Sequence, residues 1–432
     1  MDVQVSHADV LTTTADGALA AEGTKPTCRF CGAALRHTFV DLGMSPLCES
    51  YVPADRVNAM EAFYPLHAKV CESCLLVQLE EFVTADAIFS EYAYFSSYSD
   101  SWVAHARSYV EMAVERFELD ANSLVVELAS NDGYLLQHVV ERGIPALGIE
   151  PAANVAEVAR EKGIETIVEF FGRDLAHRLA AEGRVANLLA ANNVMAHVPD
   201  LNDFVGGIPI VLAPDGVATI EVPHLLRLVE SNQFDTIYHE HFSYFSLLTA
   251  RKVFEAHGLE LFDVDELKSH GGSLRYYVQR AGTGRQAVTS RVNDVAERER
   301  ALAFDTLEGH RSFERQVHET KWRLLEFLIA RRREGKRIAG YGAPGKGNTL
   351  LNFCGIRTDL LAYTVDRNPY KQGQFLPGTH IPIKHPEVLE QDRPDYILIL
   401  PWNLKDEIMK QLDYAREWGA QFVVPIPEVQ VL

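Results

Sequence analysis

The chain of 432 residues has no long apolar run, no excess of basic residues and few cysteines. A membrane-spanning helix needs roughly 18 or more consecutive apolar residues, and no segment approaches that length. The net charge of −19 disfavours nucleic acid or an anionic membrane surface as the main partner. The N-terminus lacks a basic stretch followed by an apolar core, so residues 1–25 are expected to be a disordered tail and not a signal peptide.

Only six cysteines occur, and four of them form the CxxC pairs Cys28–Cys31 and Cys71–Cys74. This usage indicates metal binding in a reducing compartment, so we expect a cytoplasmic protein. Each CxxC turn presents two thiolates to one ion, and tetrahedral zinc takes four such ligands. A redox dithiol is the alternative, although it normally involves a single CxxC in a βαβ setting. Because four protein ligands leave no open position, we expect the zinc to be structural.

The segment between the cysteine pairs contains Gly43, Pro46, Pro53 and Pro65. We therefore expect a loop-rich module over residues 26–85 that depends on zinc for its folding. The remaining cysteines, Cys48 and Cys354, are expected to be unpaired thiols.

A strand–loop–helix pattern begins with the strand Leu124–Leu128, which leads into the short turn Ala129-Ser130-Asn131-Asp132-Gly133. Such a turn lets backbone N–H groups approach a ligand closely. About twenty residues on, a second strand ends in Glu150, which is placed to accept hydrogen bonds from a ribose diol. This spacing resembles the S-adenosylmethionine site of class I methyltransferases, although their glycine-rich loop is reduced here. The alternative is an ordinary buried strand followed by a turn.

Strands and helices continue to alternate as far as residue 222, as expected for a doubly wound α/β sheet. Ligands of such sheets bind beyond the carboxyl ends of the strands, so polar residues at these ends should surround one crevice. The residues expected there are Asn131, Glu150, Asn192, Asn193 and Glu221. Phe170 or Phe171 could face an adenine ring in this crevice, or either could be a core residue.

The segment Tyr238-His239-Glu240-His241-Phe242 interleaves titratable groups with aromatic rings. Such groups are costly to bury unless they are paired or used. A metal site would more often show a helical i, i+4 histidine pair, so we prefer a general base with an orienting carboxylate and a phenol donor. A core histidine with satisfied hydrogen bonds is the alternative for His239 or His241 taken singly.

Two further segments carry polar groups suited to a substrate. The stretch from Glu91 to Ser99 is dense in aromatic rings and hydroxyls, and it could line a pocket that binds a base, a sugar or a phosphate. Packing of the zinc module onto the next domain explains that stretch equally well. His270 precedes Gly271 and Gly272 in a loop that is expected to present polar groups.

Charged helices are expected over residues 288–333, followed by a second α/β unit with a literal GxGxxG, Gly340-Tyr-Gly342-Ala-Pro-Gly345. Asp366 lies 21 residues beyond Gly345, and by pattern alone this is a dinucleotide fingerprint. A glycine loop at a helix N-terminus, however, binds any diphosphate. Pro344 within the loop and Lys346 directly after it make a sugar-nucleotide pyrophosphate a reasonable guest.

The four-cysteine module, the methyltransferase-like core with its YHEHFSYFS segment and the GYGAPGKGN loop together resemble the sugar C-methyltransferases of antibiotic biosynthesis. The resemblance covers residues 26–432. It implies a mixed α/β fold with an N-terminal zinc-binding domain at 26–85, a central Rossmann-like class I methyltransferase domain at 86–285 and a second Rossmann-like domain at 286–432. The C-terminal domain would complete the sugar-nucleotide site.

The resemblance also implies the reaction and the roles of individual residues. A methyl group would pass from S-adenosylmethionine to a ring carbon, most simply C3, of a dTDP-4-keto-6-deoxysugar through an enolate beside the ketone. His241 would be the base, with Tyr238, Glu240 and His197 around the sugar. The residues expected to bind the methyl donor are Glu127, Ala129, Asn131, Asp132, Gly133, Glu150, Phe171, Asn192 and Asn193. Those expected to bind the substrate are Tyr92, Tyr94, Ser97, His270, Lys346 and Asn348. The alternatives are an NAD-dependent oxidoreductase that uses the GxGxxG and a sugar-nucleotide binding module without activity.

Overall fold

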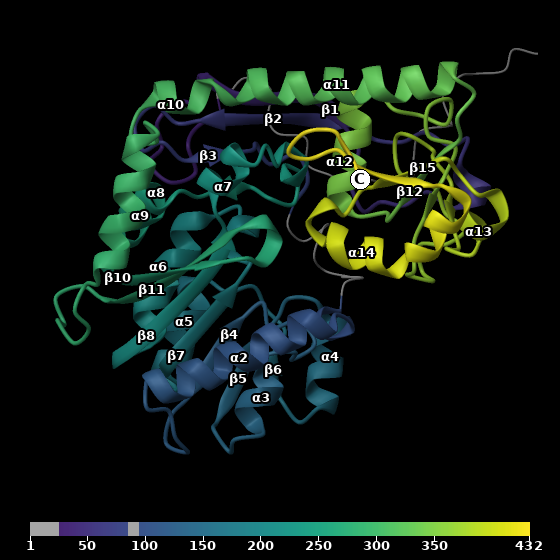
Figure 1. The fold of residues 1–432 in the computed structure, drawn as a ribbon. Helices are drawn as coiled ribbons and strands as arrows, with labels where there is room; N and C mark the ends of the chain where they lie inside the picture. The colour runs from purple at the N-terminus through teal and green to yellow at the C-terminus, as the bar shows by residue number, and fades with distance from the viewer. Residues whose placement is uncertain (1–25, 85–94) are drawn as a thin grey trace, which may run out of the picture.

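The computed structural model describes residues 26–84 and 95–432. The expected tail and the expected substrate contacts Tyr92 and Tyr94 lie outside the described residues. The described chain forms three β-sheets of four, seven and six strands (Figure 1).

The N-terminal module is built on a four-stranded antiparallel sheet. Its strands are β1 (His37–Ser45), β2 (Tyr64–Val70), β3 (Val77–Gln78) and β9 (Ser243–Tyr244). Long loops separate these strands, as expected, but the sheet itself was not foreseen. In β2, every second side chain is buried, namely Leu66, Ala68 and Val70. This two-residue period is typical of a strand, and the strand forms despite the prolines nearby. Only Phe242 separates His241 from β9, so the pairing of β9 with β3 holds the YHEH segment against this module.

The central domain contains a seven-stranded sheet in the order β10-β11-β8-β7-β4-β5-β6, in which β11 runs antiparallel to both its neighbours. These strands are β4 (Val125–Leu128), β5 (Ala146–Ile149), β6 (Glu165–Ile167), β7 (Ala186–Asn192), β8 (Leu212–Pro223), β10 (Leu259–Leu267) and β11 (Ser273–Arg280). The expected doubly wound α/β sheet is confirmed.

Helices pack on both faces of this sheet. On one face, α2 (Asp100–Arg116) and α3 (Leu136–Val140) share a core with Val125. On the other, α5 (Arg173–Ala181) and α6 (Leu201–Val211) share a core with Val126. Successive strand residues thus point to opposite helical layers, which is why β4 carries apolar residues on both of its faces. Helix α4 (Ala153–Glu161) follows β5.

Two helices, α7 (Leu225–Glu230) and α8 (Leu247–Ala256), lie between β8 and β10 of the central domain. Three more lead from the central sheet to the C-terminal one: α9 (Ser290–Ala301), α10 (Leu307–Arg311) and α11 (Phe313–Arg333). Helix α11 runs along the top of the molecule in Figure 1. Val292 and Val295 of α9 are buried in the same cluster as Leu261 of β10. We therefore propose the domain division above with α9 docked on the central sheet. No helix among the described residues has both the length and the apolarity to cross a membrane.

The C-terminal domain has the strand order β14-β13-β12-β15-β16-β17, parallel except for β17. The strands are β12 (Ile338–Tyr341), β13 (Thr364–Val365), β14 (Ile383–Lys384), β15 (Tyr396–Ile399), β16 (Gln421–Val424) and β17 (Gln430–Val431), with α12 (Gly345–Cys354), α13 (Val388–Asp392) and α14 (Lys405–Gln411) around them. A second Rossmann-like unit is thereby confirmed, with the glycine loop between β12 and α12.

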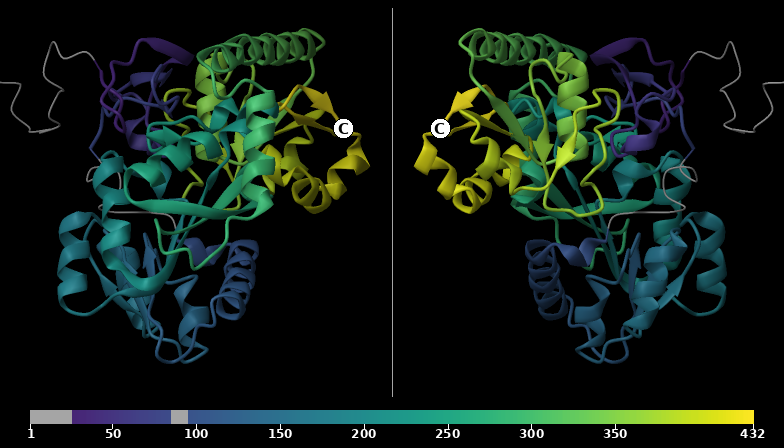
Figure 2. Two further views of the ribbon diagram at one scale, coloured as in Figure 1. Left: turned by 90° about the vertical axis from the view of Figure 1, so that its left-hand side faces the viewer. Right: turned by 90° about the vertical axis from the view of Figure 1, so that its right-hand side faces the viewer.

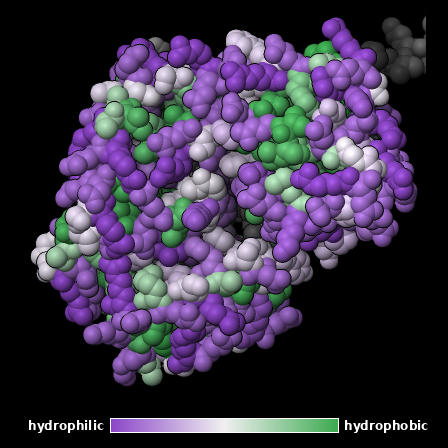
Figure 3. Space-filling model, in the orientation of Figure 1, coloured by the Kyte–Doolittle hydropathy of each residue, from purple (hydrophilic) through white to green (hydrophobic). Residues whose placement is uncertain are grey.

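The N-terminal module contacts both other domains. Val52 pairs with Phe375, and the Glu61 carboxylate accepts a hydrogen bond of 2.8 Å from the Gly378 N–H. The outer part of the central domain forms the lower lobe in two side views, with the N-terminal module and the C-terminal sheet above it (Figure 2). A recess opens between the lobes on the molecular surface (Figure 3).

Candidate active site and metal centre

One cavity of about 750 Å³ lies at the carboxyl ends of the central strands and is lined by residues from all three domains. Its lining includes twelve of the residues that the sequence singled out: Ala129, Asn131, Glu150, Phe171, Asn192, Asn193, His197, Tyr238, Glu240, His241, His270 and Lys346. Residues of the loop after β4, the histidine segment and the C-terminal lysine therefore line one common cavity.

The donor loop after β4 has an unusual backbone. Ala129, Asn131 and Gly133 have φ values of 55°, 48° and 76°. This left-handed region favours glycine, and non-glycine residues adopt it at a cost of about 1–3 kcal/mol each. Retention of the conformation without the usual glycines indicates that the loop shape itself is required. At Gly133 a Cβ would approach Ile164 Cδ1 to 2.4 Å, so only glycine fits there without a shift.

Glu150 fastens this loop from the end of β5. Its Oε2 accepts from the Asn131 N–H and its Oε1 from the Ala152 N–H, both at 2.9 Å. Each carboxylate oxygen retains a second lone pair for a ligand hydroxyl. The sequence predicted the ligand role and did not foresee the loop contact.

The amides at the end of β7 are placed to bind a ligand. Asn193 has a φ of 54°, and neither polar atom of its buried carboxamide has a hydrogen-bond partner among the described residues. Buried polar groups are normally satisfied, so these atoms are suited to a bound molecule. With the acid of Glu150 and the open loop, this donor set fits S-adenosylmethionine.

Five predicted residues do not line the cavity: Glu127, Asp132, Gly133, Ser97 and Asn348. Ser97 Oγ donates a hydrogen bond to the Asp132 carboxylate, and Lys162 Nζ donates to the Asp132 backbone carbonyl at 2.7 Å. Glu127 is fully buried in β4, and Asn348 is fully buried in α12. Asp132 thus ties the turn after β4 to Ser97 and Lys162, and the direct ligand roles of all five residues stay predictions.

Glu221 was expected at the crevice, and the structure corrects this. Its carboxylate lies outside the cavity lining and accepts from Arg275 Nη2 at 2.6 Å and from Ser269 Oγ at 2.7 Å. His105 Nε2 lies 3.1 Å from the same carboxylate. Burial acts to raise the pKa of Glu221, but His105 and Arg275 lower it to about 2. The strand-end position did not indicate that this acid is held in an ion pair.

His241 has a defined tautomer. Its Nδ1 lies 2.9 Å from the backbone carbonyl of Thr236, and because a carbonyl only accepts, Nδ1 carries the proton. The lone pair is therefore on Nε2. Burial holds the pKa of His241 well below its ordinary value, and His197 adds to the effect. The imidazole is neutral near pH 7 and able to take a proton.

Two rings flank this imidazole. The ring centroid of Tyr238 lies 4.1 Å from that of His241, and the His197 centroid lies 4.7 Å away. Burial lowers the pKa of His197 to about 4, so it too is neutral. Burial, assisted by the charge of Glu49, raises the pKa of Glu240 to about 8. A neutral imidazole, a phenol and a protonated carboxyl can each donate a hydrogen bond here.

His239 differs from His241 in its surroundings. Its Nε2 lies 3.3 Å from the Pro65 carbonyl, and its ring packs edge-on against Tyr64 at 5.9 Å. It does not line the cavity. Of the two histidines, His239 therefore fits the alternative of a core histidine with satisfied hydrogen bonds. The two rings therefore do not converge on a metal.

Lys346 closes the cavity from the C-terminal domain. Its Nζ donates to Asn403 Oδ1 at 2.9 Å and lies 5.0 Å from the centroid of the Trp402 ring. Burial lowers its pKa, and the charge of Asp235 opposes the effect. In the adjoining glycine loop, the Ala343 N–H donates to Asp366 Oδ2 at 2.7 Å.

Several lining residues were missed from the sequence, among them Cys48, Glu49, Glu81, Trp102 and Thr236. The first three come from the N-terminal module, for which the sequence indicates only a zinc-dependent fold. Thr236 acts through its carbonyl, which any residue could supply. Only its position before the YHEH segment could have indicated it.

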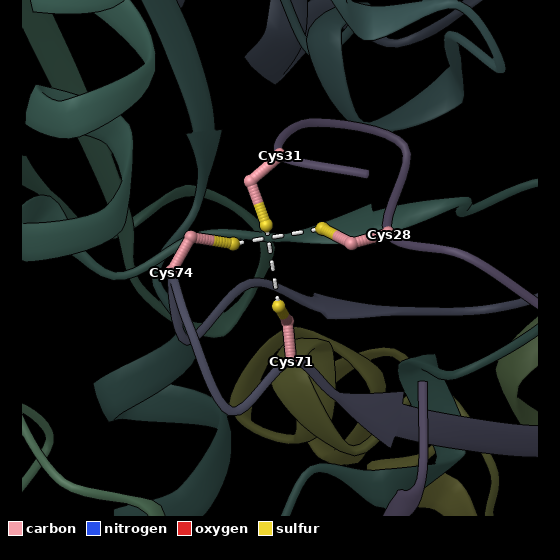
Figure 4. Close-up of side chains that lie close together, drawn as sticks. All are labelled: Cys28, Cys31, Cys71 and Cys74. Carbon is pink, nitrogen blue, oxygen red and sulfur yellow. Dashed lines mark hydrogen bonds between the residues drawn. The ribbon is translucent and has the colours of Figure 1, made fainter. Parts of the chain in front are cut away.

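The four paired cysteines converge on one point (Figure 4). All four Sγ atoms lie within 4.8 Å of one another, with Cys28–Cys74 and Cys31–Cys71 separations of 3.5 Å. Tetrahedral zinc with bonds of about 2.3 Å requires sulfur separations of about 3.8 Å, so the donor set fits. Gln78 Nε2 donates to Cys28 Sγ at 3.1 Å. The cluster lies apart from the cavity lining, as a structural site should.

Comparisons with known proteins agree with this architecture. Family models match a zinc binding domain at residues 28–89, a methyltransferase domain at 102–264 and a C-methyltransferase C-terminal domain at 268–427. The chain is 36% identical over 405 residues to C-methyltransferase NovU from Streptomyces niveus, covering 94% of this chain and 96% of the relative.

Solved structures give a more distant likeness. A magnesium protoporphyrin IX methyltransferase (ChlM) from Synechocystis PCC 6803 with bound SAM is 14% identical, with a TM-score of 0.31 over 42% of this chain and 82% of that one. An S-adenosylmethionine-dependent methyltransferase from Clostridium acetobutylicum ATCC 824 is 11% identical, with a TM-score of 0.33 over 41% and 91%.

The relative that spans nearly the whole chain decides between the alternatives. It sets aside the NAD-dependent oxidoreductase and the binding module without activity. S-adenosylmethionine is the methyl donor, and the four cysteines form a structural zinc site. The chain belongs to the S-adenosylmethionine-dependent C-methyltransferase family.

Proposed function

We propose that this enzyme methylates a ring carbon, most simply C3, of a dTDP-4-keto-6-deoxysugar. The observation that carries the proposal is the shared cavity, in which the donor loop, His241 and Lys346 face one space. The resemblance to sugar C-methyltransferases supplies the substrate class, and the relative's name supplies the bond that is formed.

The chemistry requires a base because a saturated carbon is a poor nucleophile. Loss of the proton beside the 4-keto group gives an enolate, whose carbon can attack an electrophilic methyl group. Nε2 of His241 would accept this proton, since Nδ1 already carries one for the Thr236 carbonyl. A neutral imidazole in a buried site suits this step.

Charge that grows on the keto oxygen needs a donor. His197, Tyr238 and Glu240 line the cavity around His241 and can provide N–H or O–H groups. Donors fixed before the reaction stabilise an oxyanion without reorganisation, and each is worth several kcal/mol in a site that excludes water. We assign these residues to the oxyanion and to the sugar hydroxyls.

The donor would be held by the loop Ala129–Gly133, Glu150 and the Asn192–Asn193 pair. When bound, S-adenosylmethionine supplies the electrophilic methyl group. The chain contributes the orientation: Glu150 keeps the loop in place through the Asn131 N–H, and Asn193 offers an unsatisfied carboxamide.

Lys346 and the N-terminus of α12 would hold the diphosphate of the sugar nucleotide. A helix N-terminus favours anions through its free N–H groups, and the lysine adds a full charge. The sugar ring would then reach from Lys346 towards His241 within the same cavity.

Thermal shift measurements test this proposal with three ligands. We expect S-adenosylhomocysteine and dTDP each to raise the melting temperature, and NAD to leave it unchanged. Stabilisation by NAD, or no response to dTDP, would overturn the assignment. Product NMR after incubation with a panel of dTDP-4-keto sugars then identifies the methylated carbon.

A further inference from the structure

An aspartate and a tryptophan from different domains meet beneath the cavity. The indole Nε1 of Trp402 donates a hydrogen bond of 2.7 Å to Oδ2 of Asp235. Asp235 is fully buried in the short helix η4 (Phe234–Thr236), and Trp402 is 9% exposed in η6 (Trp402–Leu404). Neither residue lines the cavity. Because a buried carboxylate is unfavourable unless it is paired or used, this pair requires an explanation.

On one side, the pair leads to the proposed phosphate partner. Nζ of Lys346 lies 5.0 Å from the centroid of the Trp402 ring. Burial raises the pKa of Asp235 to about 6, while the charge of Lys346 and the Trp402 hydrogen bond oppose the rise. The indole therefore contacts Lys346 with its face and Asp235 with its N–H.

On the other side, the pair leads to the proposed base. Asp235 directly precedes Thr236, whose carbonyl accepts the Nδ1–H of His241 at 2.9 Å. Phe234 packs edge-on against Phe353 of α12 with a centroid separation of 5.4 Å. Since α12 also contains Lys346, η4 contacts the C-terminal domain through two of its three residues, Phe234 and Asp235.

We propose that Asp235 and Trp402 are positioning residues, which hold the Thr236 carbonyl and the His241 imidazole at a fixed distance from Lys346. This inference rests on the proposed function. A sugar nucleotide held at Lys346 spans two domains. If η4 were loose, the imidazole that is hydrogen-bonded to it would be poorly aligned with the reacting carbon. A misplacement of about 1 Å can cost about a hundredfold in rate. The pair should therefore affect proton removal and not nucleotide binding.

Deuterium uptake isolates that step. With S-adenosylhomocysteine bound and dTDP-4-keto-6-deoxyglucose in D₂O, His241 removes the proton beside the ketone, exchanges it with solvent and returns a deuteron to the same carbon. Trp402→Phe removes the indole donor and keeps a ring against Lys346. We expect uptake to fall about ten- to hundredfold while dTDP affinity stays at the wild-type value. Trp418→Phe is the matched control, because its indole donates to the Pro394 carbonyl at 3.1 Å away from the cavity.

The aspartate side supplies a second test that does not depend on the indole. Asp235→Asn keeps an acceptor oxygen and should retain most of the uptake, whereas Asp235→Leu should lose as much as Trp402→Phe. Combining Asp235→Leu with Trp402→Phe should cost no more than either change alone. Wild-type uptake in Trp402→Phe and Asp235→Leu, or equal losses in Asn and Leu variants, would overturn the inference. Absence of uptake in the unaltered enzyme would instead overturn the proposed function.

Discussion

The carboxylate of Glu150 accepts a hydrogen bond of 2.9 Å from the backbone N–H of Asn131, across the mouth of the donor site. The same relationship recurs in the C-terminal domain, where the Asp366 carboxylate accepts from the Ala343 N–H at 2.7 Å. In each unit, an acid after the second strand fixes the ligand loop after the first. The chain thus contains two loops held in this way, and we assign one to the methyl donor and the other to the sugar nucleotide.

Glu150→Ala should weaken S-adenosylhomocysteine binding by about 1.5–3 kcal/mol, because it removes a charged hydrogen-bond acceptor and releases the Asn131 loop. The dTDP affinity should not change. Calorimetric titration of both ligands measures the difference. Glu165→Ala, an acid on the neighbouring strand β6 outside the cavity lining, is the control and should leave both affinities unchanged.

Lys346→Ala should do the reverse and weaken dTDP binding by about 1.5–3 kcal/mol. The loss should shrink at high salt if solvent reaches the site. Lys384→Ala controls for a general effect, since its Nζ also lies on an aromatic ring, 4.3 Å from the Tyr363 centroid, outside the cavity lining. A weaker S-adenosylhomocysteine affinity with normal dTDP binding in Lys346→Ala would mean that the two ligands are assigned to the wrong domains.

The pH profile of kcat/KM should reflect two groups with shifted pKa values, His241 and Glu240. Because the pKa of His241 lies well below 6.5, its imidazole is neutral throughout the neutral range, and the acid limb of kcat/KM should lie below pH 6.5. The pKa of Glu240 is raised to about 8, so it is protonated below that pH and its donor is lost above it. Glu240→Gln, which cannot titrate, should remove the alkaline limb near pH 8. An unchanged limb in that variant would exclude Glu240 as its source.

Cys71→Ser should lower the zinc content and destabilise the N-terminal module, because structural zinc contributes about 10 kcal/mol or more to the folding of small domains. Metal analysis and thermal melting report both effects. Activity should fall with the fold, since Cys48 and Glu49 bring this module into the cavity. Cys354→Ser should keep its zinc. If a chelator abolished turnover while melting and dTDP binding stayed normal, the ion would be catalytic.

Much of this architecture follows from local pattern. Strands such as Ala146–Ile149 can be predicted from hydrophobic periodicity. Because ligands bind at the carboxyl ends of strands in α/β sheets, the acids that follow these strands can be predicted as site residues. The antiparallel sheet of the N-terminal module was not predicted. Its strands β3 and β9 are only two residues long, and they are too far apart in the sequence for a local pattern to indicate their pairing.

The site shows a similar division. Side-chain chemistry marked His241 and Lys346, but partner choice did not follow from sequence: Glu221 pairs with Arg275, and His239 faces Pro65. Trp402 lies 167 residues from Asp235, so their contact depends on how whole domains pack. Long-range pairs of this kind are set by tertiary structure alone.

Methyl transfer from S-adenosyl-[methyl-¹³C]methionine to dTDP-4-keto-6-deoxyglucose, followed by NMR, tests the proposed reaction at the bond that it forms. We expect a ¹³C methyl group bonded to the ring carbon beside the ketone. We also expect His241→Asn to lose at least about a hundredfold in rate. His257→Asn alters a histidine whose Nδ1 also lies on a backbone carbonyl, at 2.8 Å from Val253 O, and it should keep the wild-type rate. Turnover by His241→Asn at the wild-type rate, or a label on oxygen or nitrogen, would overturn the proposed reaction.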